Sequence, residues 1–210
     1  MNNSVGNAAR LLGAGLRALL ALTVVCGVLY PLAVTGIAQA AFSHQANGSE
    51  VRDGTGTVVG SSLIGQDYGD DLRWFQPRPA AGLGQNTINT QYALLVSGAS
   101  NKAADSPDLV KAVREARDKV VADNTVPGFA PRPSQVPADA VTSSGSGLDP
   151  AISPAYAALQ APRVAARNHL ALSRVEELVA AHTEGRTLGF MGEPRVNVLE
   201  LNIALKSLAG

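Results

Sequence analysis

The sequence of 210 residues predicts an α+β protein: a single N-terminal transmembrane helix followed by an exported domain with strands first and mostly helices after. Three observations support this prediction. Residues 18–42 form an apolar run without a charged side chain, and residues 51–66 hold short β-prone runs separated by glycines. From residue 106 onward, helix-start signals recur.

The apolar run from Ala18 to Phe42 is long enough to cross a membrane. As a helix, its roughly 25 residues extend about 37 Å, whereas the hydrocarbon core is roughly 30 Å thick, so the helix can span it with some tilt. Pro31 removes one backbone donor and is expected to kink the helix. Arg10 and Arg17 precede the run, and the positive-inside rule keeps them in the cytoplasm. The sequence therefore predicts a cell-membrane protein with a short cytoplasmic N-terminus (1–17), a transmembrane helix (18–42) and an exported soluble domain (43–210).

A cleaved signal peptide is the alternative interpretation of this segment. Ala38-Gln39-Ala40 has the form of a cleavage site, and the two preceding arginines resemble the basic start of a signal peptide. The apolar run is longer than the about 7–15 residues of a signal peptide, which favours a retained anchor. Both interpretations export the residues that follow Phe42.

The exported part begins with β-prone runs. Residues 51–54, 57–60 and 62–66 are separated by Asp-Gly and Gly, a pattern typical of a hairpin or meander. Residues 74–79 predict a strand or turn, because their prolines do not allow a helix to continue. Residues 80–105 are rich in Gly, Asn, Ala and Ser and are expected to form a loop around one apolar stretch.

Helices dominate the second half. Ser106-Pro107 combines an N-cap residue with proline at the first helical position and predicts an amphipathic helix to about Ala122. Ser153-Pro154 repeats the pattern and opens a helix expected to carry Leu170, which Pro162 is expected to bend or divide. The remaining expectations are an irregular segment over 127–137, a helix over 172–181, a strand over 195–199 and a closing helix over 199–208.

Composition excludes several classes of function. The chain carries 17 basic and 17 acidic residues and only 4% aromatics, so no nucleic-acid partner is predicted, since such binding needs a basic face with stacking aromatics. The one cysteine, Cys26, lies in the apolar run. The exported domain therefore has no disulfide, no cysteine-based zinc site and no cysteine nucleophile.

Few residues form a pattern that catalysis or metal binding requires. His44, His169 and His182 are far apart and lack acidic or cysteine neighbours at ligand spacing, so no metal site is predicted. Ser146 stands between two glycines, but it departs from the G-x-S-x-G pattern and no histidine is placed to act as its base. A turn that needs a positive φ is the favoured interpretation, and no catalytic residue is predicted.

The run Ser97-Gly98-Ala99-Ser100-Asn101 is the candidate for an anion-binding loop. Its backbone N–H groups have the form of a cradle for a phosphate. The run itself holds no lysine, and no helix follows it at once. An ordinary turn is therefore the favoured interpretation from the residues alone.

Further segments, spread in order over about residues 20–205, carry the motifs of a known family. They are Tyr30-Pro31, Thr35-Gly36, Gln39, Gln45–Ser49, Gly60-Ser61, Leu63–Gln66, Phe75, Arg78-Pro79, Ser97–Asn101, Val141-Thr142, Ser144–Pro150, Ile152-Ser153, Ala157, Gln160, Arg163–Ala165, Gly192–Leu199 and Leu201-Asn202. On these residues the chain resembles the C subunit of the bacterial Kdp potassium-transporting ATPase.

The resemblance implies a non-catalytic subunit with a retained N-terminal helix. Its partners would be a channel-like potassium-binding subunit, an ATP-hydrolysing P-type subunit and a small fourth subunit, which together import potassium with high affinity. The resemblance further implies that the chain assembles or stabilises the complex and acts as a catalytic chaperone that raises the ATP affinity of the hydrolysing subunit.

By the same resemblance, Ser97, Gly98, Ser100 and Asn101 would contact ATP, the one cofactor implied. Ala99 departs from the family pattern, which has a second glycine there, and an alanine at a positive φ would cost about 1 kcal/mol or more. The charge rule also exports this loop, whereas ATP is cytoplasmic. An exported cap on the channel-like subunit is therefore favoured, with an anchored or secreted envelope hydrolase using Ser146, or an exported solute-binding domain, as alternatives.

Overall fold

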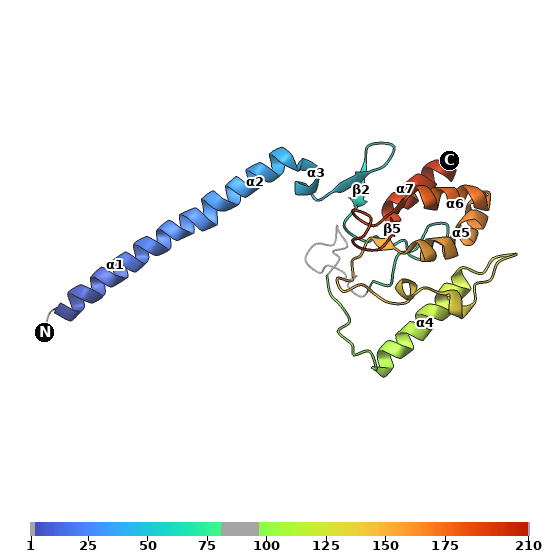
Figure 1. The fold of residues 1–210 in the computed structure, drawn as a ribbon, viewed down its shortest axis with the longest axis horizontal. Coiled ribbons are helices and arrows are strands. Elements are labelled where there is room, and N and C mark those ends of the chain that lie inside the picture. Colours follow the sequence, from blue (N-terminus) through green and yellow to red (C-terminus); the bar gives the residue numbers. More distant parts are fainter. Residues whose placement is uncertain (1–2, 81–96, 210) are drawn as a thin grey trace. The chain divides into compact units, whose positions relative to one another are not determined.

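The computed structural model describes residues 3–80 and 97–209 and confirms the predicted α+β class (Figure 1). The chain divides into two compact units, Met1–Ser49 and Glu50–Gly210, and each is described by itself. Most of the loop predicted over 80–105, with its apolar stretch, lies outside the described residues.

The first unit is a long apolar helix followed by one short turn of helix. Helix α1 (Asn3–Val24), the π-helical turn η1 (Val25–Leu29) and α2 (Tyr30–Ala41) follow one another without a break, and α3 (Ser43–Ala46) comes next. By length and composition, residues 4–41 form a helix that can cross a membrane, and its most apolar stretch has no buried residue.

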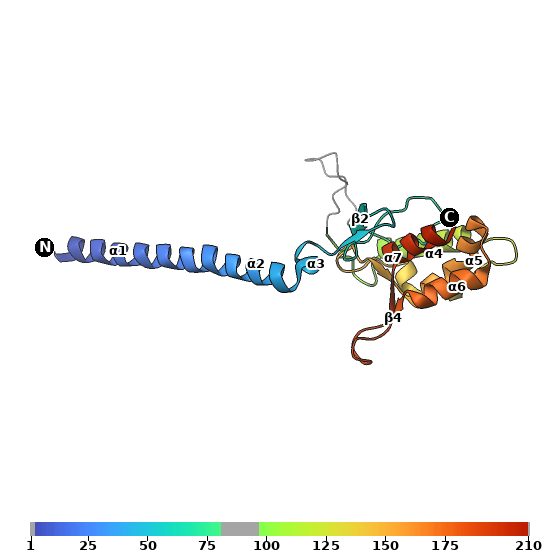
Figure 2. The same ribbon diagram turned by 90° about the horizontal axis from the view of Figure 1, so that it is seen from above.

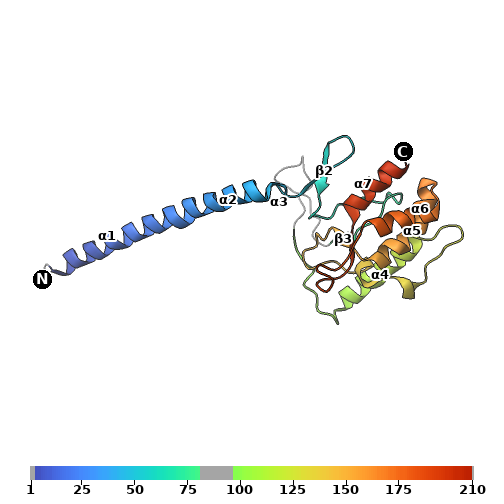
Figure 3. The ribbon, with the colours of Figure 1, turned by 45° about the horizontal axis from the view of Figure 1, so that its top comes forward.

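One expectation about this helix needs correction. Arg10 and Arg17 lie within α1 rather than before the helix, because the Ala- and Leu-rich residues that flank the apolar run also favour helix. The sequence predicts a kink at Pro31, which lies in the first turn of α2, and the helix runs on from α1 into α2 in Figure 3. The π-helical turn just before Pro31 widens the backbone, and the Tyr30 N–H donates to the carbonyl of Val25, five residues back.

The second unit opens with a hairpin, as the glycine-punctuated β-prone runs predict. Strands β1 (Glu50–Arg52) and β2 (Val58–Ser61) pair antiparallel, with Glu50 opposite Ser61 and a bulge after Val51. In the turn between them, the Asp53 carboxylate accepts hydrogen bonds from the backbone N–H groups of Thr55 and Thr57. The run over 62–66 does not add a third strand, so the hairpin is correct and the longer meander is not.

A small sheet and four helices build the rest of this unit (Figures 1 and 3). Strand β5 (Arg195–Asn197) lies between β3 (Ala151–Ile152) and β4 (Thr183–Glu184), and both pairings are antiparallel. The helices are α4 (Pro107–Asp123), α5 (Pro154–Asn168), α6 (Leu172–Ala181) and α7 (Val198–Ala209), with 3-10 turns η2 (Pro133–Gln135) and η3 (Ala138–Ala140) between α4 and β3. Helix α6 packs against both α5 and α7.

The core forms where α5, α6 and α7 meet the sheet. Val164, Val175, Val196, Leu201 and Leu205 are each completely buried there. Burying such a side chain stabilises the fold by about 1.5–3 kcal/mol relative to leaving it exposed. The core therefore depends on apolar positions of three helices and one strand, each of which was predicted from the sequence.

The N-terminal caps of α4 and α5 can be compared with the caps that the sequence predicts. The Ser153 hydroxyl accepts a hydrogen bond from the Tyr156 N–H at 3.0 Å, so the predicted cap of α5 is confirmed. Ser106 occupies the N-cap position of α4, but its side chain makes no capping hydrogen bond.

Four expectations about the irregular parts need correction. Pro162 does not divide α5, and Leu170 lies beyond its end, because His169 closes the helix with a left-handed backbone (φ 56°). The strand predicted over 195–199 stops at Asn197, where α7 begins at once. The segment over 127–137 includes one 3-10 turn at Pro133, since proline suits the first position of a short helix.

Candidate functional site

A segment outside the helices and strands, residues 72–78, runs through the second unit and is held by side-chain amides rather than by a strand. Its centre, Phe75, is completely buried. The Asn202 amide of α7 accepts from the Phe75 N–H at 2.9 Å and donates to the Phe75 carbonyl at 3.0 Å. The Gln160 amide of α5 does the same for Gln76, at 2.7 and 3.0 Å.

The geometry of an extended chain explains this arrangement. Successive residues direct their N–H and C=O groups to opposite sides, so Phe75 faces one helix and Gln76 faces the other. A buried backbone group without a partner costs about as much as a lost hydrogen bond. Asn202 and Gln160 therefore replace the strands that would normally pair with residues 75 and 76, and we call them the amide clamp.

Arg163, also on α5, fixes the start of the same segment. It is completely buried, and its guanidinium donates to the carbonyls of Leu72 and Trp74 and to the side-chain oxygens of Asn124 and Gln160. Burial lowers the pKa of Arg163 to about 10, so the side chain is charged at neutral pH. The clamp and Arg163 together determine where Arg78 emerges from the core.

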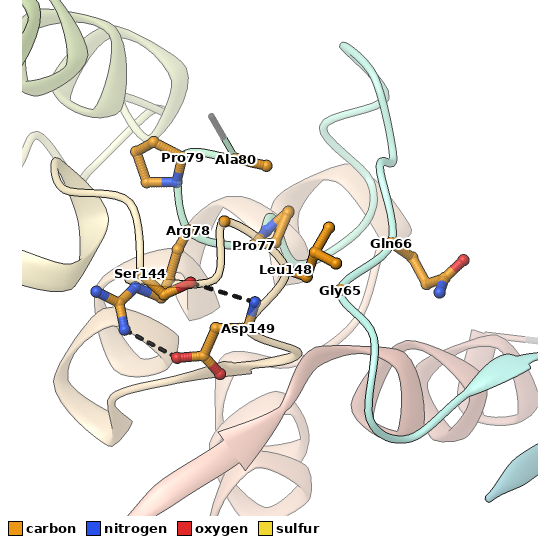
Figure 4. A pocket seen from close by; sticks show the side chains of 10 residues that line it. Gly65, Gln66, Pro77, Arg78, Pro79, Ala80, Ser144, Leu148 and Asp149 are labelled. Carbon is orange, nitrogen blue, oxygen red and sulfur yellow. Dashed lines mark hydrogen bonds and ion pairs between the residues drawn. The ribbon is translucent and has the colours of Figure 1, made fainter. Parts of the chain in front are cut away.

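Arg78 emerges beside a small pocket formed by loops (Figure 4). The pocket is lined by Gly65, Gln66, Pro77, Arg78, Pro79, Ala80, Ser144, Gly147, Leu148 and Asp149. Its volume of about 10 Å³ leaves room for about one water molecule. A Cβ on Gly65 would lie 2.8 Å from the carbonyl oxygen of Asp149, so this wall requires glycine.

Arg78, the one cation among the described residues that line this pocket, is already paired. The Arg78 guanidinium lies 2.9 Å from an Asp149 carboxylate oxygen, as the dashed line in Figure 4 marks. The same guanidinium donates to the carbonyl of Thr142 at 3.4 and 3.5 Å. Arg78 therefore joins two loops and does not offer its charge to a phosphate.

The predicted anion loop lies next to this pocket. The Gly98 N–H and the Ser97 hydroxyl both donate to the carbonyl of Ser146, at 2.8 and 3.2 Å, while Ser100 and Asn101 are exposed. Lys102, which follows the loop, lies 3.6 Å from the Asp108 carboxylate. The structure thus brings Ser97 and Gly98 to the Ser146 turn, and the Gly98 N–H is directed at this turn.

The strain expected at Ala99 is absent. Within this loop the positive φ falls on Asn101 (φ 51°), and Ala99 is not among the described residues with a positive φ. Asparagine tolerates the left-handed region better than most residues. The replacement of a glycine by alanine at position 99 therefore costs little in this backbone.

Ser146 has the geometry of a turn residue. Its hydroxyl accepts from the Leu148 N–H at 3.1 Å and lies 3.2 Å from the Ser144 hydroxyl. Gly147 carries the positive φ (69°) that the sequence predicts for this loop. Of the two histidines in this unit, His169 ends α5 and His182 lies 2.9 Å from the Leu178 carbonyl. These contacts give no support to a serine nucleophile with a histidine base.

A larger cavity of about 460 Å³ lies between α4, α5 and the 67–80 segment. Its lining includes three acidic and three basic residues, and Lys119 lies 3.4 Å from Asp70 and 3.1 Å from Asp123. Within residues 3–80 and 97–209, no three His, Cys, Asp or Glu side chains lie together as metal ligands.

The residues that organise this site were not assigned a role from the sequence. Gln160, Arg163 and Asn202 appear there only as parts of family motifs. The sequence does hold an indication of their structural role, because each of the three is a polar residue on a helix face that otherwise carries buried apolar side chains.

Comparison with known proteins gives consistent matches over nearly the whole chain. The family model described as K+-transporting ATPase, c chain (KdpC), matches residues 12–207. A protein of Streptomyces avermitilis named potassium-transporting ATPase KdpC subunit is 64% identical, covering 99% of this chain and 98% of that protein. Proteins of the same name from Streptomyces coelicolor (63%; 99% and 97%) and Citrifermentans bemidjiense (47%; 87% and 90%) are also similar.

Proposed function

Because this chain belongs to the KdpC family, the c chain of K+-transporting ATPases, we propose that it is a non-catalytic subunit that assembles and stabilises such a complex. In this proposal it joins a channel-like potassium-binding subunit, an ATP-hydrolysing P-type subunit and a small fourth subunit in the cell membrane. The match of the family model to residues 12–207 is the observation that carries the proposal.

The first unit supports a role in assembly. Its helix leaves large apolar side chains such as Leu20, Leu29 and Ile37 more than half exposed. Such a surface is stable only in lipid or against partner helices. With the N-terminus in the cytoplasm, this anchor would hold the second unit on the exported side as a cap on the channel-like subunit.

The second unit supports a binding role rather than a catalytic one. Three of the polar side chains buried in its interior, Gln160, Arg163 and Asn202, form hydrogen bonds with the 72–78 segment. Arg78 is likewise paired with Asp149. These hydrogen bonds and this ion pair hold the segments of the second unit in a fixed arrangement. A fixed surface suits a protein that docks on a partner.

We further infer that the chain raises the ATP affinity of the hydrolysing subunit indirectly. A subunit that binds the ATP-competent conformation more tightly than the other conformation increases the population of that conformation. No direct contact of Ser97, Gly98, Ser100 or Asn101 with ATP is required. The Gly98 N–H that would cradle a phosphate is already used by Ser146.

Assembly can be tested through Gly36 in α2. A Cβ at Gly36 or at Gly13 meets no atom of this chain within 4 Å, so leucine at either position leaves the isolated chain undisturbed. Gly36→Leu is expected to reduce co-purification with the other subunits in mild detergent at least about 5-fold, since small residues allow helices to approach closely. Gly13→Leu, in the part predicted to precede the membrane, is the matched control. A wild-type chain that purifies alone from cells making all the subunits would contradict the proposed function.

The indirect effect on ATP can be tested on the purified complex. Omitting this chain is expected to weaken ATP binding by the hydrolysing subunit by about 5-fold or more, within the usual range of coupling between sites. Ser100→Ala and Asn101→Ala should leave the ATP dissociation constant of the complete complex unchanged. A loss of ATP affinity in these two variants, with assembly intact, would instead favour direct contact with the nucleotide.

A further inference from the structure

The hairpin of β4 and β5 projects from the body of helices in the second unit (Figure 2). Its base is firmly rooted, because β5 is the central strand of the small sheet and its Val196 is completely buried. Residues 185–194 connect the two strands and form its tip. The tip is therefore attached to a strand, β5, that belongs to the core.

The tip presents large apolar side chains to solvent. Leu188 is 78% exposed and Phe190 is 71% exposed, the two highest values for large apolar residues in the described part of the second unit. Met191, 45% exposed, lies next to them in sequence. Single exposed apolar residues need no explanation, but three within four positions of one turn point to an interaction site.

The backbone of the tip is ordered and strained. The N–H of Thr187 donates to the carbonyl of Met191 at 2.9 Å, and the reverse bond measures 3.0 Å. Leu188 has a positive φ of 55°, which is rare for a bulky side chain. Strain of this kind usually persists at sites of function, and here it holds Leu188 in an exposed position.

We propose, on the basis of the proposed function, that Leu188, Phe190 and Met191 form a docking tip that inserts into an apolar pocket of the channel-like subunit, on which the second unit is proposed to form a cap. Phe190 is the rigid aromatic anchor, and the flexible Met191 adapts to the wall of the pocket. The tip is fixed before it meets its partner, so little conformational entropy is lost on docking.

The charges at the neck of the hairpin favour a protein partner over a lipid surface. Arg186 lies 2.8 Å from Glu193, and Arg195 lies 2.9 Å from Glu184, so the neck has no excess of positive charge. Attraction to anionic lipids requires such an excess. Residues 185–194 also contain no tryptophan or tyrosine, the residues enriched at membrane interfaces.

The proposal is tested in the complete complex by photo-crosslinking. The full chain carries p-benzoylphenylalanine in place of Phe190, or in place of Leu172 as a control, which is exposed (41%) on α6. The residue at position 190 is expected to form a covalent adduct with the channel-like subunit, and the control residue none. An adduct with a different subunit only, with lipid only, with a second copy of this chain only, or with nothing overturns the proposal.

A second measurement uses Phe190→Ser and Leu188→Ser, with Leu172→Ser as the matched control. Each tip variant is expected to leave the fold unchanged and to accelerate release from the complex after dilution in detergent at least about 10-fold, as expected for an interface hot spot. Release of the two tip variants at the wild-type rate overturns the docking proposal and leaves the proposed function unaffected. If the wild-type chain itself does not join the complex, the docking proposal and the proposed function are both overturned.

Discussion

Replacing Arg163 with leucine is expected to lower the free energy of unfolding by about 3–5 kcal/mol, a large part of the about 5–15 kcal/mol that stabilises a typical domain. Leucine cannot donate to the carbonyls of Leu72 and Trp74 or to the Asn124 amide oxygen. Each buried acceptor left without a partner costs about 1–3 kcal/mol. The loss of stability therefore comes from buried oxygens left without a hydrogen-bond donor, in addition to any change in packing.

The one tryptophan of the chain makes this measurable. Trp74 lies in the segment that Arg163 holds, so denaturant unfolding of the full chain in detergent, followed by its fluorescence, reports on this region without the signal of the long apolar helix. Arg163→Lys keeps the charge but lacks the planar fork of donors, and it should be intermediate. Arg167→Leu removes a charge from the exposed face of the same helix and should change stability by less than about 0.5 kcal/mol. Equal losses for Arg163→Leu and Arg167→Leu would contradict the role of the network.

The elements that follow local rules were predictable from the sequence. Helix α6 has its predicted bounds, α4 and α5 start at the predicted prolines, and the hairpin at Asp53 follows the Asp-Gly signal. In each case a few neighbouring residues determine the outcome: a cap, a proline at the first turn or a periodic apolar stripe. Errors fell at helix ends, as at Leu170, where the left-handed backbone of His169 ends α5 without glycine.

The arrangement of the site was not predictable in the same way. The pairing of Asn202 with Phe75 joins residues 127 positions apart, and that of Gln160 with Gln76 joins residues 84 apart. No local pattern encodes such contacts, because a side-chain amide that replaces a strand has no periodicity. For the same reason the sequence could not show that Gly98 donates to Ser146, which removes a donor from the predicted anion loop.

Replacing Asn202 with aspartate is expected to cost about 3–5 kcal/mol of stability at pH 7, and much less at low pH. The two side chains have nearly the same shape, and Asn202 is only 3% exposed. An ionised aspartate still accepts from the Phe75 N–H, but it places a negative oxygen against the Phe75 carbonyl where the amide donated. Burial and this carbonyl both raise the pKa of the new carboxyl in the folded state above its unfolded value of about 3.9.

The sign of the pH dependence follows from that shift. Since the folded state binds the proton more tightly, the variant is most stable below about pH 4, where the neutral carboxyl donates its O–H to the Phe75 carbonyl as the amide did. Its stability then falls as the pH rises through the raised folded pKa. Asn202→Leu, which has no such proton, should be destabilised by about 2–4 kcal/mol with no added pH dependence, and Asn101→Asp, an exposed control, should behave like the wild type. The measurement is Trp74 fluorescence unfolding between pH 4 and pH 8, reported as the difference from wild type at each pH. A difference for Asn202→Asp that does not change across this range would show that the amide donor to Phe75 does not hold the extended segment in place.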